Sequence, residues 1–269
     1  MNAHVESFYD PATSTFSHVV FDGEGGRAAI IDPVLDYDPA TTRTSTTSAQ
    51  RVLDFVHAHG LQVDWILETH AHADHLTAAA WLKRETAAPV AIGRGITKVQ
   101  ERFKALLGLE DDFAVDGSQF DRLLDDGDSF NIGQLTARVM ATPGHTDDSL
   151  TYLIGDAAFI GDTLFAPETG TARVDFPGGD AHKLYCSIHR LFDLPADTRI
   201  FLCHDYPQGR AARALTSIAD QEQHNIHVGG GASEDAFVEM RRKRDATLST
   251  PKLIDPALHA NIRAGVLPS

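Results

Sequence analysis

One short segment, Thr69–His75, constrains this chain more than any other part of the sequence. It reads Thr-His-Ala-His-Ala-Asp-His, so it places three imidazoles and one carboxylate within six residues. The apolar run Trp65-Ile66-Leu67 before it is typical of a buried strand, and we expect a helix over Leu76 to Glu85 after it. The segment is therefore expected to leave the carboxyl end of a strand, where α/β proteins collect their functional sites.

The spacing within this segment predicts convergent side chains. Residues two apart in an extended chain point the same way, so we expect His70, His72 and Asp74 to converge, while His75 faces a second position at the turn. Imidazoles and carboxylates are common protein ligands of zinc and iron. We therefore interpret the segment as a metal site rather than as a solvated polar loop.

Three later segments place the same types of side chain directly after an apolar, strand-like run. They are Thr142–Thr146 with His145, Gly161-Asp162, and Cys203–Tyr206 with His204. In order and spacing, the four motifs together resemble those of the metallo-β-lactamase superfamily. The resemblance implies an α/β (α+β) fold, the αββα sandwich, in which two mixed sheets are flanked by helices.

In the hydrolases of this superfamily the corresponding residues bind two metal ions. The resemblance then implies a dinuclear site in which Asp162 bridges the two ions. A metal pair of this kind lowers the pKa of a shared water and polarises a carbonyl group. On this basis one ion would contact His70, His72, His145 and Asp162, and the other would contact Asp74, His75 and His204.

A finer resemblance covers nearly the whole chain and is to the persulfide dioxygenase (ETHE1-like sulfur dioxygenase) branch. It implies one Fe(II) per chain, bound by His70, His145 and Asp162, a two-histidine, one-carboxylate triad that leaves positions open for a sulfur donor and O2. The other ligand types, His72, Asp74, His75 and His204, would orient the triad from outside it, unless they hold a second metal. The segments that carry the resemblance are Glu68–Leu76, Thr171–Gly179, His204-Asp205-Tyr206 and Asn261–Gly265.

The reaction that this branch implies is the oxidation of glutathione persulfide by O2 to glutathione and sulfite. Such redox chemistry requires iron, because zinc does not change its oxidation state. The alternative is a glyoxalase II-type hydrolase of glutathione thioesters with two zinc ions. A binding or scaffold protein with an inactive site is disfavoured, since the ligand residues of all four motifs are intact.

Candidate substrate-binding residues follow from the two carboxylates of glutathione, for which an arginine fork is the natural partner. Arg173 is one candidate, and the alternative is a structural pair with Asp175. Tyr206 either donates to substrate or packs. Tyr185 is a weaker candidate that suits the core better. Cys203 is interpreted as a small buried residue rather than as a nucleophile.

Two positions depart from the pattern of the branch. Val174 stands where close relatives carry cysteine, which removes a thiol near the site. Asp147-Asp148 replaces the small residue that often follows the histidine motif. The second departure affects the expected shape of the opening through which substrate reaches the site, and it does not affect the metal site itself.

Composition bounds the organisation and the partners of the chain. Its 269 residues, 42% of them hydrophobic, suit one domain over residues 1–269, with 226–269 as a C-terminal helical or extended appendage. The formal charge of −15 argues against nucleic acid and anionic membranes as partners. Two cysteines make no disulfide framework, and the first ten residues lack the pattern of a signal peptide, so we expect a cytoplasmic protein. We also expect a homo-oligomer, a dimer.

Secondary-structure patterns complete these expectations. Phe16–Ile31 predicts a hairpin, and Leu35–Thr47 a loop. Arg210–Asn225 predicts a helix, and a further helix is expected from Ser233 to Asp245, with the cations Arg241–Arg244 stabilising its last turns. Residues 246–269 are expected to wrap the surface or a neighbouring subunit.

Overall fold

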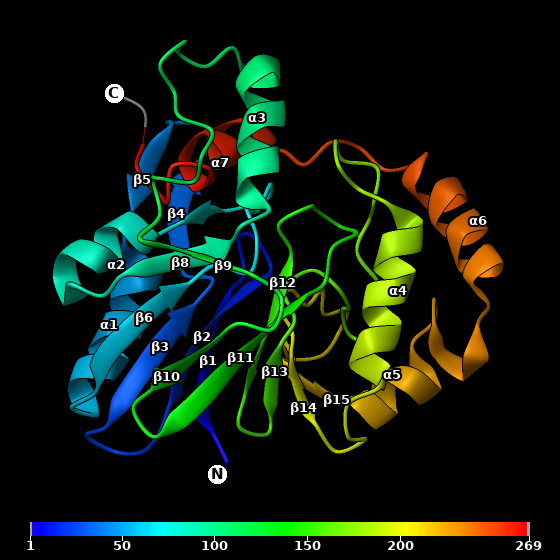
Figure 1. Cartoon of the computed structure of the whole chain (residues 1–269), viewed down its shortest axis with the longest axis horizontal. Coiled ribbons are helices and arrows are strands. Elements are labelled where there is room, and N and C mark those ends of the chain that lie inside the picture. Colours follow the sequence, from blue (N-terminus) through cyan, green and yellow to red (C-terminus); the bar gives the residue numbers. More distant parts are fainter. Residues whose placement is uncertain (1, 268–269) are drawn as a thin grey trace.

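The apolar faces of the central strands are covered by a second sheet on one side and by helices on the other (Figure 1). The computed structural model describes residues 2–267. The first sheet has the order β1-β2-β3-β6-β8-β9 and the second the order β10-β11-β12-β13-β14-β15. Both are mixed, since β3, β6, β8 and β9 run parallel in the first sheet, and β13 and β14 in the second. The expected αββα sandwich is thereby confirmed.

The bounds of the elements are as follows. The first sheet contains β1 (His4–Asp10), β2 (Thr15–Phe21), β3 (Arg27–Ile31), β6 (Gln62–Leu67), β8 (Val90–Gly93) and β9 (Arg122–Leu124). The second contains β10 (Ser129–Ile132), β11 (Leu135–Ala141), β12 (Leu150–Ile154), β13 (Ala157–Phe159), β14 (Arg199–Phe201) and β15 (Leu215–Ser217). A small third sheet joins β5 (Arg43–Ser45), β4 (Val34–Asp38) and β7 (Leu76–Thr77). The helices are α1 (Thr47–Ala58), α2 (Ala79–Thr86), α3 (Ile96–Leu107), α4 (Ala181–Phe192), α5 (Ile218–His224), α6 (Glu234–Asp245) and α7 (Ile254–Asn261), with a short 3-10 turn η1 (Gly229–Gly231).

Three apolar layers hold these elements together. The middle layer lies between the two sheets and includes Ile31, Tyr152 and Phe159. One outer layer packs α1, α2, α3 and α7 on the first sheet, and the other packs α4, α5 and α6 on the second. The last helix, α7, therefore contributes to the core of the first half of the chain, although it lies at the opposite end of the sequence (Figure 1).

Local patterns predicted several elements correctly. The hairpin is present as β2 and β3, which pair antiparallel. The helix that follows Ser233 is α6, and the Ser233 hydroxyl accepts a hydrogen bond from the Ala236 N–H at its start. Asp180 likewise caps α4 by accepting from the N–H groups of His182 and Lys183. Such side-chain caps supply partners that the first turn of a helix lacks.

Four segments differ from the expectations. The predicted loop 35–47 contains the β4–β5 hairpin, and the predicted helix 76–85 begins only at Ala79, after the strand β7. The predicted helix 210–225 is limited to α5, because residues 215–217 pair with β14 instead. Residues 246–269 were expected to wrap the surface or a neighbouring subunit, but they contain α7, whose Ala257 and Leu258 are buried in the core on the first sheet. In each case a partner distant in sequence overrides the local pattern.

Residues 2–267 contain no helix that is both long enough and apolar enough to cross a membrane.

A histidine inside the sandwich makes stability depend on pH. His18 is buried, and this burial, only partly offset by the Asp32 carboxylate and the Leu202 carbonyl, lowers its pKa to about 4. Folding therefore favours neutral His18, so its contribution is fully present above pH 6.5, declines as the pH falls below 6.5 and is lost by about pH 4. We expect the unfolding free energy to fall by about 2 kcal/mol more in the wild type than in His18→Gln between about pH 7 and about pH 5. Denaturant titrations at both pH values measure this, and equal losses in the two proteins would contradict it.

Candidate metal centre

The four motifs meet at one edge of the sandwich, beyond the carboxyl ends of four strands. The segment Thr69–His75, called the histidine segment below, follows β6. His145 follows β11, Asp162 follows β13 and His204 follows β14. Residues 70–75 form no helix and no strand, so their side chains are free of the periodicity of regular structure. The structure brings all seven candidate ligands together. It places His75 with His72 and Asp74 and puts His70 in another group, so the convergence expected of an extended segment is wrong.

The first group consists of His70, His145 and Asp162, all buried. The Asp162 Oδ2 lies 4.0 Å from the His70 Nε2 and 3.7 Å from the His145 Nε2. One ligand atom from each residue lies within 4.8 Å of the others. Two imidazoles and a carboxylate thus face a common point, which is the donor set of a facial triad.

The second group consists of His72, Asp74, His75 and His204, and it adjoins the first through Asp162. The His204 Nε2 lies 3.3 Å from the Asp74 Oδ2 and 3.4 Å from the Asp162 Oδ1. Asp162 therefore directs one oxygen to each group. His72 falls in this second group, whereas the resemblance to dinuclear hydrolases placed it with His70 and His145.

The donor atoms of these groups fit a metal ion. Within the described residues, several of them are buried without a hydrogen-bond partner: His70 Nε2, both ring nitrogens of His72, His75 Nε2, His204 Nε2 and Asp162 Oδ1. Buried polar atoms are normally paired, so a cluster of unpaired ones that converge is the arrangement expected of a metal site. These observations support a metal centre without identifying the metal.

The electrostatics of three candidate ligands, His70, His72 and Asp74, suit metal binding. Burial, followed by the neighbouring imidazoles, holds the pKa of His70 and of His72 well below the ordinary value. Both rings are therefore neutral, which is the form that binds a metal. Burial raises the pKa of Asp74, but His204 and His75 outweigh this effect and bring it well below its usual range. Asp74 is accordingly an ionised carboxylate.

Side chains and carbonyls around the groups orient the rings. The His145 Nδ1 lies 2.7 Å from the Arg173 carbonyl oxygen, which makes it a donor and leaves Nε2 as the atom facing Asp162. The His72 Nε2 lies 3.2 Å from the Asp32 Oδ1. Asp32 also accepts from the Thr69 N–H and hydroxyl. The hydrogen bond of the His145 Nδ1 fixes the orientation and tautomer of that ring. The Asp32 carboxylate lies beside His72 as a charged neighbour that makes no hydrogen bond to it.

Asp32 was missed as a functional residue by sequence reasoning. It follows β3 directly, and its only local signal was the Asp32-Pro33 pair that ends the strand. The residue is buried and adopts a positive φ of 48°, which is unusual for a residue other than glycine. A carboxylate at the end of the strand adjacent to β6 was the available clue.

The two aspartates that depart from the branch pattern have structural roles. The buried Asp148 accepts the Ala71 N–H at 2.8 Å and so holds the histidine segment from the side of the second sheet. Asp147 pairs with Arg102 of α3 at 2.7 Å, and Arg102 also donates to the Pro177 carbonyl. The pair therefore joins α3 to the loop that follows Asp162.

The candidate substrate residues have different surroundings. The Arg173 guanidinium pairs with both oxygens of Asp175 at 2.6 Å and donates to the Ser249 carbonyl. The structure therefore contains the pair with Asp175 that was the alternative to substrate binding. Tyr206 is 43% exposed and its ring stacks on His204 with centroids 6.0 Å apart. The Tyr185 hydroxyl donates to the Ala232 carbonyl between α4 and α6. Tyr206 is the one of the three whose side chain both lies against a candidate ligand and reaches solvent.

Cys203 is buried, and burial followed by the nearby carboxylates raises the pKa of its thiol well above the ordinary value. This favours the neutral thiol and agrees with its interpretation as a small buried residue rather than a nucleophile.

The basic run on α6 is divided between the interior and the surface. Arg241 is buried, pairs with Asp245 and donates to the Thr171 carbonyl. Asp245 in turn accepts the Val174 N–H, so this pair holds the loop that contains Arg173. Arg241 is thus an interior ion pair and not only a cation at a helix end.

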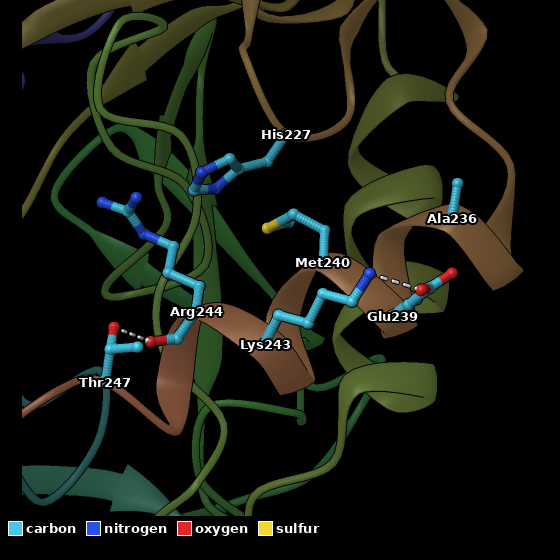
Figure 2. Close-up of a pocket in the computed structure, with 7 residues that line it drawn as sticks. All are labelled: His227, Ala236, Glu239, Met240, Lys243, Arg244 and Thr247. Carbon is cyan, nitrogen blue, oxygen red and sulfur yellow. Dashed lines mark hydrogen bonds and ion pairs between the residues drawn. The ribbon is translucent and has the colours of Figure 1, made fainter.

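Lys243 and Arg244 of this run line a shallow groove of about 620 Å³ (Figure 2). Lys243 pairs with Glu239 along the helix, and the His227 ring lies across the groove from them. The groove contains none of the candidate ligands of the two groups.

Comparison with known proteins agrees with the fold and the site. Residues 11–204 match the family model of the metallo-beta-lactamase superfamily, and the chain belongs to this superfamily of metal-dependent enzymes. Its sequence is 51% identical over 275 residues to a probable metallo-hydrolase of Burkholderia pseudomallei, covering 98% of this chain and 94% of the relative. It is 43% identical to glyoxylase B2 of Dictyostelium discoideum, covering 99% and 92%.

Among solved structures, the chain is similar to ETHE1 from Myxococcus xanthus. The TM-score is 0.78 at 34% sequence identity, and the match covers 98% of this chain and all of the other. The chain is also 30% identical over 97% of its length to the mitochondrial persulfide dioxygenase ETHE1 of Homo sapiens, covering 89% of that relative. These matches support the resemblance to the persulfide dioxygenase branch, including the segment beyond residue 204.

Proposed function

We propose that this protein is an Fe(II)-dependent persulfide dioxygenase, with one iron per chain on His70, His145 and Asp162. Its substrates would be glutathione persulfide and O2, and its products glutathione and sulfite. The observation that carries the proposal is the buried triad of the first group, in a chain that is similar over its whole length to ETHE1.

The overall reaction balances with one water. Glutathione persulfide, O2 and water yield glutathione, sulfite and two protons. The outer sulfur loses four electrons, which reduce O2, and its bond to the glutathione sulfur breaks. Two oxygen atoms of sulfite come from O2 and the third from water.

Iron, when bound, would supply the redox chemistry and open positions for the persulfide sulfur and O2. The chain's own residues would hold it and set the polarity of the pocket. The His145 ring is fixed by the Arg173 carbonyl, so its Nε2 is kept toward the centre. The His204 Nε2 lies beside both the Asp74 Oδ2 and the Asp162 Oδ1, and His204 would hold a proton or a water there.

Substrate contacts belong to the same proposal. Tyr206 lies beside His204 with part of its ring exposed, so its hydroxyl is the preferred candidate for a contact with the glutathione portion. Arg173 can bind a substrate carboxylate only if it breaks one of its hydrogen bonds to Asp175 or to the Ser249 carbonyl. Tyr185 would have to leave the Ala232 carbonyl.

The alternative is a glyoxalase II-type dinuclear hydrolase of glutathione thioesters. Two observations favour it: the second group supplies enough donors for another metal, and a relative at 43% identity is named glyoxylase B2. In that case Asp162 would bridge two zinc ions, and its two oxygens already point to the two groups.

Metal content and activity together decide between the two reactions. We expect protein purified without added metal to contain one iron per chain and to consume O2 when given glutathione persulfide. The same preparation should not hydrolyse S-lactoylglutathione at a comparable rate. Two zinc ions per chain with thioester hydrolysis and no O2 uptake would establish the hydrolase and refute the dioxygenase.

A further inference from the structure

The histidine segment lacks the main-chain hydrogen bonds that hold regular structure. Within residues 2–267, the N–H groups of residues 70–75 donate to no main-chain carbonyl. Side chains from elsewhere take over this task. Asp148 binds the Ala71 N–H on one side, and the buried side chain of Asn261 binds the segment on the other.

Asn261 uses its whole amide on this segment. Its Nδ2 donates to the carbonyl oxygens of His72 and His75, each at 2.8 Å, and its Oδ1 accepts the Thr77 N–H, also at 2.8 Å. The side chain is 3% exposed, so water does not substitute for it readily. One rigid group therefore ties three points of the chain between residues 72 and 77.

The position of Asn261 comes from packing at the far end of the chain. Asn261 is the last residue of α7, and its neighbours Leu258, Ala260 and Ile262 are buried in the layer on the first sheet. Next to it, Gly265 has φ +83° and lies so close that an added Cβ would be 3.0 Å from the Thr77 carbonyl. The segment after α7 thus packs directly against β7.

We infer that Asn261 is a positioning residue of the metal centre. By holding the carbonyls of His72 and His75 on one amide, it sets the turn that carries Asp74 and keeps the ring of His75 beside that of His72, at 4.1 Å between centroids. Asn261 touches no reacting atom, so its effect on the metal passes through the main chain of the ligands. The inference rests on the metal centre and not on the proposed reaction.

The chain supplies a matched control in Gln100 of α3. Its amide is also fully buried and makes three hydrogen bonds, donating to the Ile262 carbonyl and to Gln119 and accepting the Gly117 N–H. It therefore anchors the same C-terminal segment, one residue beyond Asn261, without contacting the histidine segment. Loss of either amide leaves buried partners unpaired and is expected to cost stability.

The test is Co²⁺ binding to metal-free protein, followed by the visible absorption of the bound ion. We expect Asn261→Ala to bind Co²⁺ at least roughly 10-fold more weakly than the wild type and with an altered spectrum. Gln100→Ala is expected to keep wild-type affinity and spectrum while its melting temperature falls. Both titrations are made below the melting temperature of the less stable variant.

Two outcomes would overturn the inference: wild-type Co²⁺ affinity and spectrum in Asn261→Ala, or an equal loss of affinity in Gln100→Ala. If Asn261→Ala does not fold, Asn261→Ser leaves a smaller cavity, and the same criteria apply to it. The rise in melting temperature on adding Co²⁺ gives a second measure of affinity. Because neither O2 nor a persulfide is used, failure here is distinct from failure of the proposed dioxygenase.

Discussion

Alanine in place of His145 is expected to leave the protein without iron and without O2 uptake. His145 contributes one of the two imidazoles of the first group, and its Nε2 lies 3.7 Å from the Asp162 Oδ2. Loss of a direct ligand should exceed the roughly 100-fold decrease that removal of an outer partner can cause. Elemental analysis of the purified variant and O2 uptake on glutathione persulfide measure the two effects.

A suitable control for this variant is His182→Ala. His182 is an exposed histidine on α4 that pairs with Glu234 and belongs to neither group of candidate ligands. It should keep both iron and activity. Normal iron content in the His145 variant would mean that the triad is wrongly assigned, whatever the activity of the protein.

Substitution of His204 by alanine separates the two proposed reactions by metal content. If one iron is bound by the first group, His204 lies outside its ligands, and the variant should keep the wild-type amount of iron. Its activity should fall by roughly 10- to 100-fold, because His204 contacts the Asp162 Oδ1 at 3.4 Å and so helps to orient this ligand.

The dinuclear alternative predicts a different result for the same variant. His204 would then be a ligand of the second metal, and its loss should reduce the metal content by one ion per chain. Metal analysis of the wild type and the variant, prepared side by side, requires no substrate. A loss of one metal per chain would refute the single-iron proposal even if both proteins consumed O2.

Both predictions concern residues that the sequence alone brought forward. Each candidate ligand ends an apolar, strand-like run, and strands with this polarity present their carboxyl ends at a common edge. The resemblance of these motifs to those of the metallo-β-lactamase superfamily was therefore enough to expect that His70, His145, Asp162 and His204 would meet. The helices with clear caps, such as α4 after Asp180, were also predictable, since a cap acts within three or four residues.

Segments whose structure depends on distant partners could not be predicted in this way. Residues 215–217 form β15 because the edge of β14 is available to them, although the surrounding sequence favours a helix. Residues 35–38 likewise form β4, which pairs with β7 and with β5. Pairing at a sheet edge depends on which strand lies at that edge in the folded protein, and the local hydrophobic periodicity does not predict which strand this is.

The sequence by itself determined the fold class and the candidate ligands, because the superfamily motifs that indicate both lie in short segments of the chain. Only the tertiary structure decided which groups surround them. It pairs Arg173 with Asp175, sets Asp32 against His72, and brings Asn261 onto the histidine segment from the other end of the chain. These contacts join residues up to 189 positions apart, and they form because packing of the layers brings distant parts of the main chain side by side.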